Sequence, residues 1–295
     1  MKKEQKANLF IVGAMKAGTT SFMEALAQHP DIYVSPVKEP HYFVNELPKL
    51  LYEPSRFFNL EAYFKNDFPK PLHIANLKNK EHYEQLFSLS NQEKYLAEGS
   101  TMYLHAPESA QKIQQYNPEA KIIILTREPV SRAYSHYKML TGLSRETRSF
   151  QEVVEVELDG YKRNNLSWHS YVEMSIYAKH IKRYKGLFPH VLVLSFEALI
   201  NDKDVAFDTV ANFLTIEKFE NVEVAHTNKT RSLRFKWLFF LLKKIGLKDV
   251  FSAIFGSKFK RKLFKMGSSS QSKPMDISED TLQELRQLFQ KESKE

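Results

Sequence analysis

The first residues that could carry chemistry lie in a short loop with one lysine, two glycines and three hydroxyl side chains. Residues 13–21 read Gly-Ala-Met-Lys-Ala-Gly-Thr-Thr-Ser and directly follow the apolar residues 9–12. Backbone N–H groups at a helix N-terminus bind anions, and glycine lets the chain approach a phosphate group closely. Lys16 adds a positive charge inside the loop. The loop therefore predicts a phosphate site between a strand and a helix; the alternative is an ordinary turn without a ligand.

The position of Lys16 separates this loop from the P-loop of nucleotide kinases. In a P-loop the lysine directly follows a glycine and precedes the Ser or Thr that binds magnesium. Here Thr19 follows Gly18, and Lys16 lies two positions before that glycine. We therefore expect Lys16 to project from the loop toward a group linked to a 5′-phosphate. A P-loop nucleotide kinase is the alternative enzyme class.

A second motif follows another apolar run. Residues 126–137 read Thr-Arg-Glu-Pro-Val-Ser-Arg-Ala-Tyr-Ser-His-Tyr. Arg127 would stand at the end of a buried strand, and Ser135, eight residues later, would lie one or two turns into the following helix. An arginine offers paired donors and a serine offers a hydroxyl, so the two predict one phosphate site. Arg132 has a weaker claim to this site, because arginines on a helix surface are usually solvated or paired.

Together the two motifs resemble those of sulfotransferases that use 3′-phosphoadenosine-5′-phosphosulfate (PAPS), in particular a soluble, bacterial-like form of the glycosaminoglycan and carbohydrate type. Residues 16–21 are similar to the family's 5′-phosphosulfate loop. Residues 127–137 match its 3′-phosphate pattern, Arg-x-Pro-x-x-Arg-x-x-Ser-x-Tyr, at every fixed position. Residues 226–231 resemble its late loop over the nucleotide, where either a lysine or an arginine could reach the 3′-phosphate. The resemblance implies PAPS as donor, no metal, and these donor-binding residues: Lys16, Ala17, Gly18, Thr19, Thr20, Ser21, Arg127, Ser135, Lys229 and Arg231.

Sulfuryl transfer needs a base for the acceptor hydroxyl and a positive charge for the leaving phosphate. Residues 35–43, Ser-Pro-Val-Lys-Glu-Pro-His-Tyr-Phe, resemble the family's Glu-x-His-Phe-Phe segment. The resemblance implies that Glu39 is the base, with His41 as helper or substitute, and that Lys16 stabilises the leaving phosphate. The alternative for Glu39 is a solvated loop carboxylate, which is the commoner fate of glutamate.

One departure from the family lies in residues 98–103, Glu-Gly-Ser-Thr-Met-Tyr. Some heparan-type relatives carry a lysine near the sulfuryl group where this chain has Gly99, and Thr101 replaces a proline. Lys38 or another cation could substitute for that lysine. The departure weighs against a heparan acceptor specifically and keeps a non-catalytic anion- or lipid-binding protein as an alternative. The expected acceptor is a carbohydrate or glycolipid hydroxyl.

The elements that must position these residues can be predicted from the apolar runs. Strands are expected over 8–13, 121–126 and 191–195, because each contains a run of four apolar residues without alternation, which is typical of strands covered on both faces. Helices are expected over 19–28, from Pro129 onward, and over about 171–186. This alternation predicts an α/β, P-loop-like three-layer fold with a central, mainly parallel sheet flanked by helices.

The net charge of +8 is concentrated in one segment. Residues 231–265 hold eleven Lys or Arg and one acid, Asp249, interleaved with aromatic and aliphatic residues. This pattern indicates a helical cap on the core, a contact with an anionic membrane surface through 232–265, or a cleft for a polyanionic acceptor. The predicted organisation is a catalytic domain over 1–231, this basic amphipathic segment over 232–266, a linker over 267–274, and a helix over 275–295 that belongs to the catalytic domain.

Composition excludes several classes of protein. The chain has no cysteine, so it can form neither a disulfide nor a thiolate metal site. It has no apolar stretch of 18 residues, so no transmembrane helix is expected. We expect a cytoplasmic protein, with peripheral binding to the inner membrane face as the alternative. No nucleic-acid partner is expected, and the oligomeric state is left open.

Overall fold

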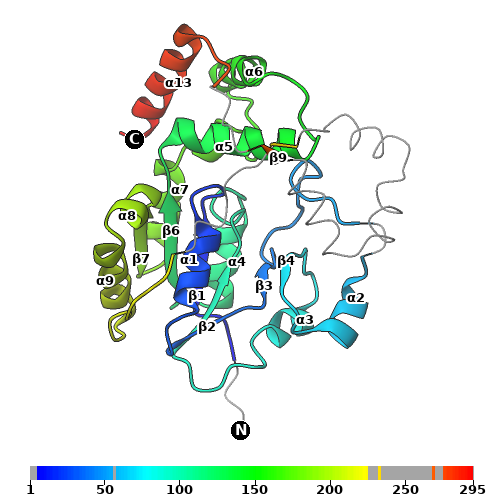
Figure 1. Ribbon diagram of the computed structural model, residues 1–295, viewed down its shortest axis with the longest axis vertical. Coiled ribbons are helices and arrows are strands. Elements are labelled where there is room, and N and C mark those ends of the chain that lie inside the picture. Colours follow the sequence, from blue (N-terminus) through cyan, green and yellow to red (C-terminus); the bar gives the residue numbers. More distant parts are fainter. Residues whose placement is uncertain (1–4, 56–57, 225–231, 234–267, 270–274, 295) are drawn as a thin grey trace.

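The computed structural model describes residues 5–55, 58–224, 232–233, 268–269 and 275–294. Its helices and strands are labelled in Figure 1. In chain order they are β1 (Leu9–Gly13), α1 (Thr19–Leu26), β2 (Ile32–Val34), β3 (Val37–Glu39), α2 (Leu60–Ala62), a π-helix (Tyr63–Asp67), β4 (Leu72–Ile74), α3 (Lys80–Gln85), β5 (Tyr95–Gly99), α4 (Ser109–Tyr116), β6 (Lys121–Thr126), α5 (Pro129–Gly142), α6 (Phe150–Lys162), a 3₁₀ turn (Glu173–Ser175), α7 (Ala178–Leu187), β7 (Val191–Ser195), α8 (Phe196–Asn201), α9 (Lys203–Leu214), β8 (Ser232–Leu233), β9 (Ser268–Ser269) and α13 (Glu279–Glu292).

The centre of the molecule is a five-stranded parallel sheet in the order β2-β5-β1-β6-β7. All five residues of β1 are buried, which explains why its sequence is apolar without alternation. In Figure 1, α5 crosses above the ends of the strands with α6 and α13 beyond it, while α8 and α9 flank β7. The predicted α/β fold with a mainly parallel sheet is confirmed.

Because the strands are parallel, their carboxyl ends meet at one edge of the sheet, where α/β proteins bind ligands. The loop of residues 14–18 follows β1, and Arg127 follows β6. Phe196 follows β7, and Thr101 lies just beyond β5. The strand order therefore brings both predicted phosphate motifs to the same edge.

A second, two-stranded parallel sheet supports the predicted base. In it Val37 pairs with Leu72 and Glu39 pairs with Ile74. Glu39 is therefore the last residue of a strand and is 7% exposed. The alternative interpretation of Glu39 as a solvated loop carboxylate is wrong, because β4 and the end of β5 enclose it.

Some predicted boundaries move. The helix expected over 171–186 begins instead as the 3₁₀ turn Glu173–Ser175, and α7 starts at Ala178. The Ser175 hydroxyl donates to the Tyr171 carbonyl and accepts from Arg132 Nε, while Ile176 is extended. These side-chain bonds hold the backbone between the two elements out of a continuous helix.

The C-terminal helix packs on the main domain. Ser278 caps α13 by accepting from the Thr281 N–H, and α13 contacts α5 and α6 through an apolar face that buries Leu285, Leu288 and Phe289. The predicted boundaries after 231, 266 and 274 and nearly all of the basic segment 232–265 lie outside the described residues. Within the part of the chain that the structure describes, no helix has the length and apolar character needed to cross a membrane.

Candidate active site

A cavity of about 1160 Å³ opens at the carboxyl edge of the sheet. The predicted site residues that line it are Lys16, Gly18, Thr19, Thr20, Ser21, Glu39, His41, Arg127 and Ser135. Ala17 does not line it, because its side chain is fully buried and its N–H donates to the Ala14 carbonyl at 3.1 Å. Lys229 and Arg231 lie outside the described residues.

The loop after β1 is packed against an aromatic ring. Gly18 has φ 82° and stands at the N-cap of α1, where it has no side chain to cover the first turn. A Cβ at this position would lie 2.6 Å from Phe196 Cδ2, so only glycine fits between loop and ring. Arg127 stacks on the same ring at 4.8 Å, and its Nη1 donates to the Lys16 carbonyl at 3.1 Å. The arginine of the second motif therefore holds the lysine loop of the first.

Lys16 is surrounded by more positive than negative charge. Burial and the nearby Arg127 and Lys38 lower its pKa to about 8, while the Glu39 carboxylate acts in the other direction. An anion placed beside these cations would relieve their mutual repulsion. The electrostatics of this edge therefore favour a bound phosphate or sulfate group.

Ser135 lies on α5 and is 8% exposed. The helix begins with Pro129 at its first position, and Glu128 caps it by accepting from the Val130 and Ser131 N–H groups. Ser135 therefore reaches the cavity from a firmly started helix whose N-terminus directly follows Arg127.

Arg132 corrects a prediction. It is fully buried rather than solvated on the helix surface. Its Nε donates to Ser175 Oγ at 2.7 Å, and its Nη2 donates to the Tyr171 carbonyl at 2.6 Å. The segment 171–177 covers this face of α5, which a surface-helix interpretation does not anticipate. Arg132 does not line the cavity, but its charge contributes to the lowered pKa of Lys16.

Glu39 faces three polar side chains. Lys38 Nζ lies 2.9 Å from Oε1, Thr101 Oγ1 donates to Oε2 at 2.9 Å, and His41 Nε2 lies 3.3 Å from Oε2. Burial by itself would raise the pKa of this carboxyl, but His41 and the Lys38 ammonium outweigh it and hold the pKa well below its usual range. Glu39 is therefore an ionised, oriented carboxylate at the cavity wall.

His41 is held through its backbone N–H and its Nδ1. Its Nδ1 lies 3.2 Å from the Ala75 carbonyl, its Nε2 lies beside Glu39, and its backbone N–H donates to Ser100 Oγ at 3.0 Å. Its φ of 48° is in the left-handed region, which these contacts hold in place. Both ring nitrogens face acceptors of the protein.

Glu98, the residue before Gly99, lies in a different environment. The hydroxyls of Tyr83, Tyr103 and Ser100 donate to it at 3.0, 2.9 and 3.1 Å. Burial raises its pKa to about 7, although these hydroxyls partly offset the effect. At Gly99 itself an added Cβ would lie 3.1 Å from Met23 Sδ. A side chain at residue 99 would therefore press against the buried Met23.

The profile of the Sulfotransferase family matches residues 8–221. The chain belongs to the sulfotransferase family. The resemblance seen in the two phosphate motifs is thereby confirmed.

Individual relatives agree with this assignment. The chain is 25% identical over 220 residues to mouse heparan sulfate glucosamine 3-O-sulfotransferase 5, covering 74% of this chain and 54% of the relative. It is 24% identical over 235 residues to human heparan sulfate glucosamine 3-O-sulfotransferase 3B1, covering 77% and 51%. The chain thus spans about half the length of these curated relatives.

Solved structures share the fold. A sulfotransferase from Alicyclobacillus acidocaldarius is 29% identical with a TM-score of 0.58, covering 87% of this chain and 99% of the other. Mouse sulfotransferase SULT7A1 complexed with PAP is 13% identical with a TM-score of 0.50, covering 98% and 84%. At that identity the second likeness concerns the fold alone.

Several residues of this sulfotransferase's cavity carry weak sequence signals. Thr101 attracts notice only as a replacement for proline, yet it donates to Glu39. Lys138 lines the cavity three residues after Ser135, a spacing that places both on one helix face. Phe196 directly follows β7, just as Arg127 directly follows β6. This parallel could have placed Phe196 at the same edge of the sheet. No sequence signal marks His73, on β4, because it reaches the cavity only through the pairing of β3 with β4.

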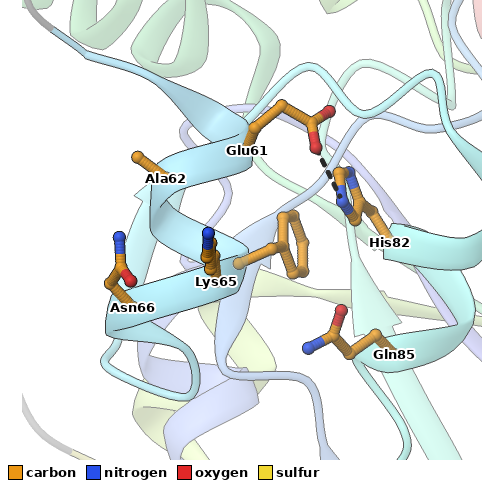
Figure 2. A pocket seen from close by; sticks show the side chains of 7 residues that line it. Glu61, Ala62, Lys65, Asn66, His82 and Gln85 are labelled. Atoms are coloured by element: carbon orange, nitrogen blue, oxygen red, sulfur yellow. Dashed lines mark ion pairs between the residues drawn. The ribbon is translucent and has the colours of Figure 1, made fainter.

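A second hollow, of about 370 Å³, lies away from this site between α2, the π-helix and α3 (Figure 2). His82 stacks on Phe64 at 4.2 Å, and its Nε2 lies 3.3 Å from Glu61 Oε2. No predicted site residue lines this hollow. Across the described ranges, no group of three or more His, Cys, Asp or Glu residues could hold a metal ion.

Proposed function

We propose that this sulfotransferase moves a sulfuryl group from PAPS to a hydroxyl of a carbohydrate or glycolipid acceptor. The observation that carries the proposal is a single cavity with two cationic phosphate motifs in one part and an ionised carboxylate in another. The loop of Lys16 at the N-terminus of α1 would hold the 5′-phosphosulfate. Arg127 and Ser135 would hold the 3′-phosphate, the group that distinguishes PAPS from ATP.

The reaction is an in-line displacement. The acceptor oxygen forms a bond to sulfur while the bond from sulfur to the 5′-phosphate oxygen breaks, and 3′,5′-ADP leaves. Lys16 neutralises the charge that grows on this phosphate, and Arg127 holds the Lys16 carbonyl and so fixes the loop. Lys16 needs to be protonated for this role.

Glu39 takes the proton of the acceptor hydroxyl. Its low pKa makes it a weak base, so we expect proton transfer late in the step, once bonding to sulfur has made the hydroxyl acidic. Thr101 and His41 orient its Oε2. His41 is the helper in this scheme because both of its ring nitrogens already face protein acceptors.

Some relatives carry a lysine where this chain has Gly99, and Lys38 supplies that positive charge instead. Its Nζ is 2.9 Å from Glu39 Oε1 and its side chain is 20% exposed, so it can turn toward an arriving sulfuryl oxygen. That movement would remove a cation from Glu39 and strengthen the base as the donor binds. The named relatives act on heparan sulfate glucosamine, which supports a carbohydrate-type acceptor, whereas the absence of a lysine at Gly99 weighs against heparan specifically.

Calorimetric titration with 3′,5′-ADP and with ATP tests the donor assignment. We expect tighter binding of 3′,5′-ADP, and a roughly 10- to 100-fold loss in Arg127→Ala, since a charged hydrogen bond contributes about 1.5–3 kcal/mol. Arg163→Ala is the matched control, because Arg163 is 74% exposed and does not line the cavity. A preference for ATP would contradict the proposal and favour a nucleotide kinase.

A further inference from the structure

The cavity has two halves of different character. Its nucleotide half is formed by the loop after β1, Arg127, Ser135 and α8. Its acceptor half is formed by residues 47–53, the β3–β4 pair, Thr101 and Met102, and the end of α5. Arg145 Nη1 ties two of these parts together by donating to the Leu50 and Leu51 carbonyls at 3.1 and 2.9 Å.

Part of the wall of the acceptor half is apolar. Six of its apolar residues are Leu47, Leu51, Leu72, Ile74, Met139 and Leu143. The register of β3 and β4 sets Ile74 beside Glu39, so apolar surface begins next to the base. Leu143 is four residues beyond Met139 at the end of α5, so this part of the wall extends for about 6 Å. Leu143 is 52% exposed, which places the far end of the wall at the mouth of the cavity.

Two of the cations of the acceptor half have a carboxylate nearby. Lys38 contacts Glu39 at 2.9 Å. Burial lowers the pKa of Arg145, and the attraction of the Glu53 carboxylate raises it, so these two charges also lie close together. Burial and then Lys38 lower the pKa of His73, so its ring is uncharged near pH 7. Among the described residues Lys138 is then the remaining cation of this half, and a single surplus charge is small beside what a polyanionic sugar chain would need.

We infer that the acceptor is an uncharged amphiphile of glycolipid type, whose hydroxyl-bearing head lies beside Glu39 and whose hydrocarbon segment lies on the wall that ends at Leu143. This inference rests on the proposed function and narrows its acceptor. Each methylene that the wall covers contributes to affinity through the removal of apolar surface from water.

The full chain saturated with 3′,5′-ADP can be titrated with methyl, butyl, hexyl and octyl β-glucoside, each below its critical micelle concentration. We expect affinity to rise with chain length, by up to about fourfold for each buried methylene. Leu143→Lys should reduce the ratio of octyl to methyl affinity and leave 3′,5′-ADP affinity unchanged. Leu89→Lys is the matched control, since Leu89 is 55% exposed and does not line the cavity.

Equal affinity for methyl and octyl glucoside would overturn the inference, as would tighter binding of a heparan-type oligosaccharide than of octyl glucoside. Failure of the proposed function gives a different result, namely no binding of 3′,5′-ADP. In that case the alkyl series measured without nucleotide still shows whether the wall binds hydrocarbon.

Discussion

The pKa values of two buried glutamates that lie close to each other in the fold are shifted in opposite directions. Burial acts on the pKa of Glu39 and of Glu98 in the same direction, upward. Glu39 contacts the Lys38 ammonium and the His41 ring, and its pKa falls well below the usual range. Glu98 accepts only from neutral hydroxyls, and its pKa rises to about 7. The charge of the partner, rather than burial, decides which carboxylate is ionised.

The two glutamates are also connected. Ser100 Oγ donates to Glu98 and accepts from the His41 N–H, and His41 then contacts Glu39. Glu98 therefore positions the residues of the site, whereas Glu39 itself lines the cavity. This distinction predicts effects of different size and kind for changes at the two positions.

The largest effect is expected for Glu39→Gln. Loss of the base should lower kcat by about 10²- to 10⁴-fold. The affinity for 3′,5′-ADP should change little, because Glu39 lies in the acceptor half. Sulfuryl transfer from labelled PAPS and calorimetry measure the two quantities. Glu61→Gln, at a side chain that is 76% exposed, is the control, and near-normal turnover of Glu39→Gln would remove the assignment.

Glu98→Gln should change the pH dependence of stability. The pKa of Glu98 rises from 4.5 to about 7 on folding, so the folded state binds the proton more tightly. The stabilisation of the folded state by this proton is complete below pH 4.5 and is lost as pH rises through 7. The free energy of unfolding changes by about 3 kcal/mol over this range. Urea unfolding at pH 5 and pH 8 should show a smaller decrease in the variant. An identical decrease in both proteins would mean that Glu98 is ionised in the folded state.

Lys38→Met makes the surroundings of Glu39 more like those of Glu98. Without the ammonium we expect the pKa of Glu39 to rise, so that kcat/KM falls at a higher pH on the acid side. The loss of a cation near the sulfuryl group should also reduce kcat by about 10- to 100-fold. Lys70→Met, at an exposed lysine outside the cavity, is the control. If the acid side of the kcat/KM profile stays at the same pH, His41 rather than Lys38 keeps the pKa of Glu39 low.

The smallest effect is expected from the titration of Lys16, a buried cation rather than a buried carboxylate. Burial, Arg127 and Lys38 lower the pKa of Lys16 to about 8, so the free enzyme loses this charge as pH rises above 8. We expect kcat/KM for PAPS to fall by about tenfold for each further pH unit. Lys16→Arg keeps its charge and should abolish this alkaline fall, even if its absolute rate is lower. A fall of the same shape in both proteins would assign the titration to another group.

The sequence by itself determined the fold class, the family and the two phosphate motifs. These are local features, because an apolar run forms a buried strand and the loop that follows it is fixed within about ten residues. The positions of Lys16, Arg127 and Ser135 could therefore be predicted from the parallel order of the strands.

The charge of Glu39, the burial of Arg132 and the apolar acceptor wall were decided only by the tertiary structure. Thr101 is 62 residues from Glu39 in the chain, and Ser175 is 43 from Arg132. The wall joins residues 47–53, 72–74 and 139–143, which meet through the β3–β4 pair and the Arg145 bonds. Burial and pKa depend on such neighbours in space, and no local pattern in the sequence specifies them.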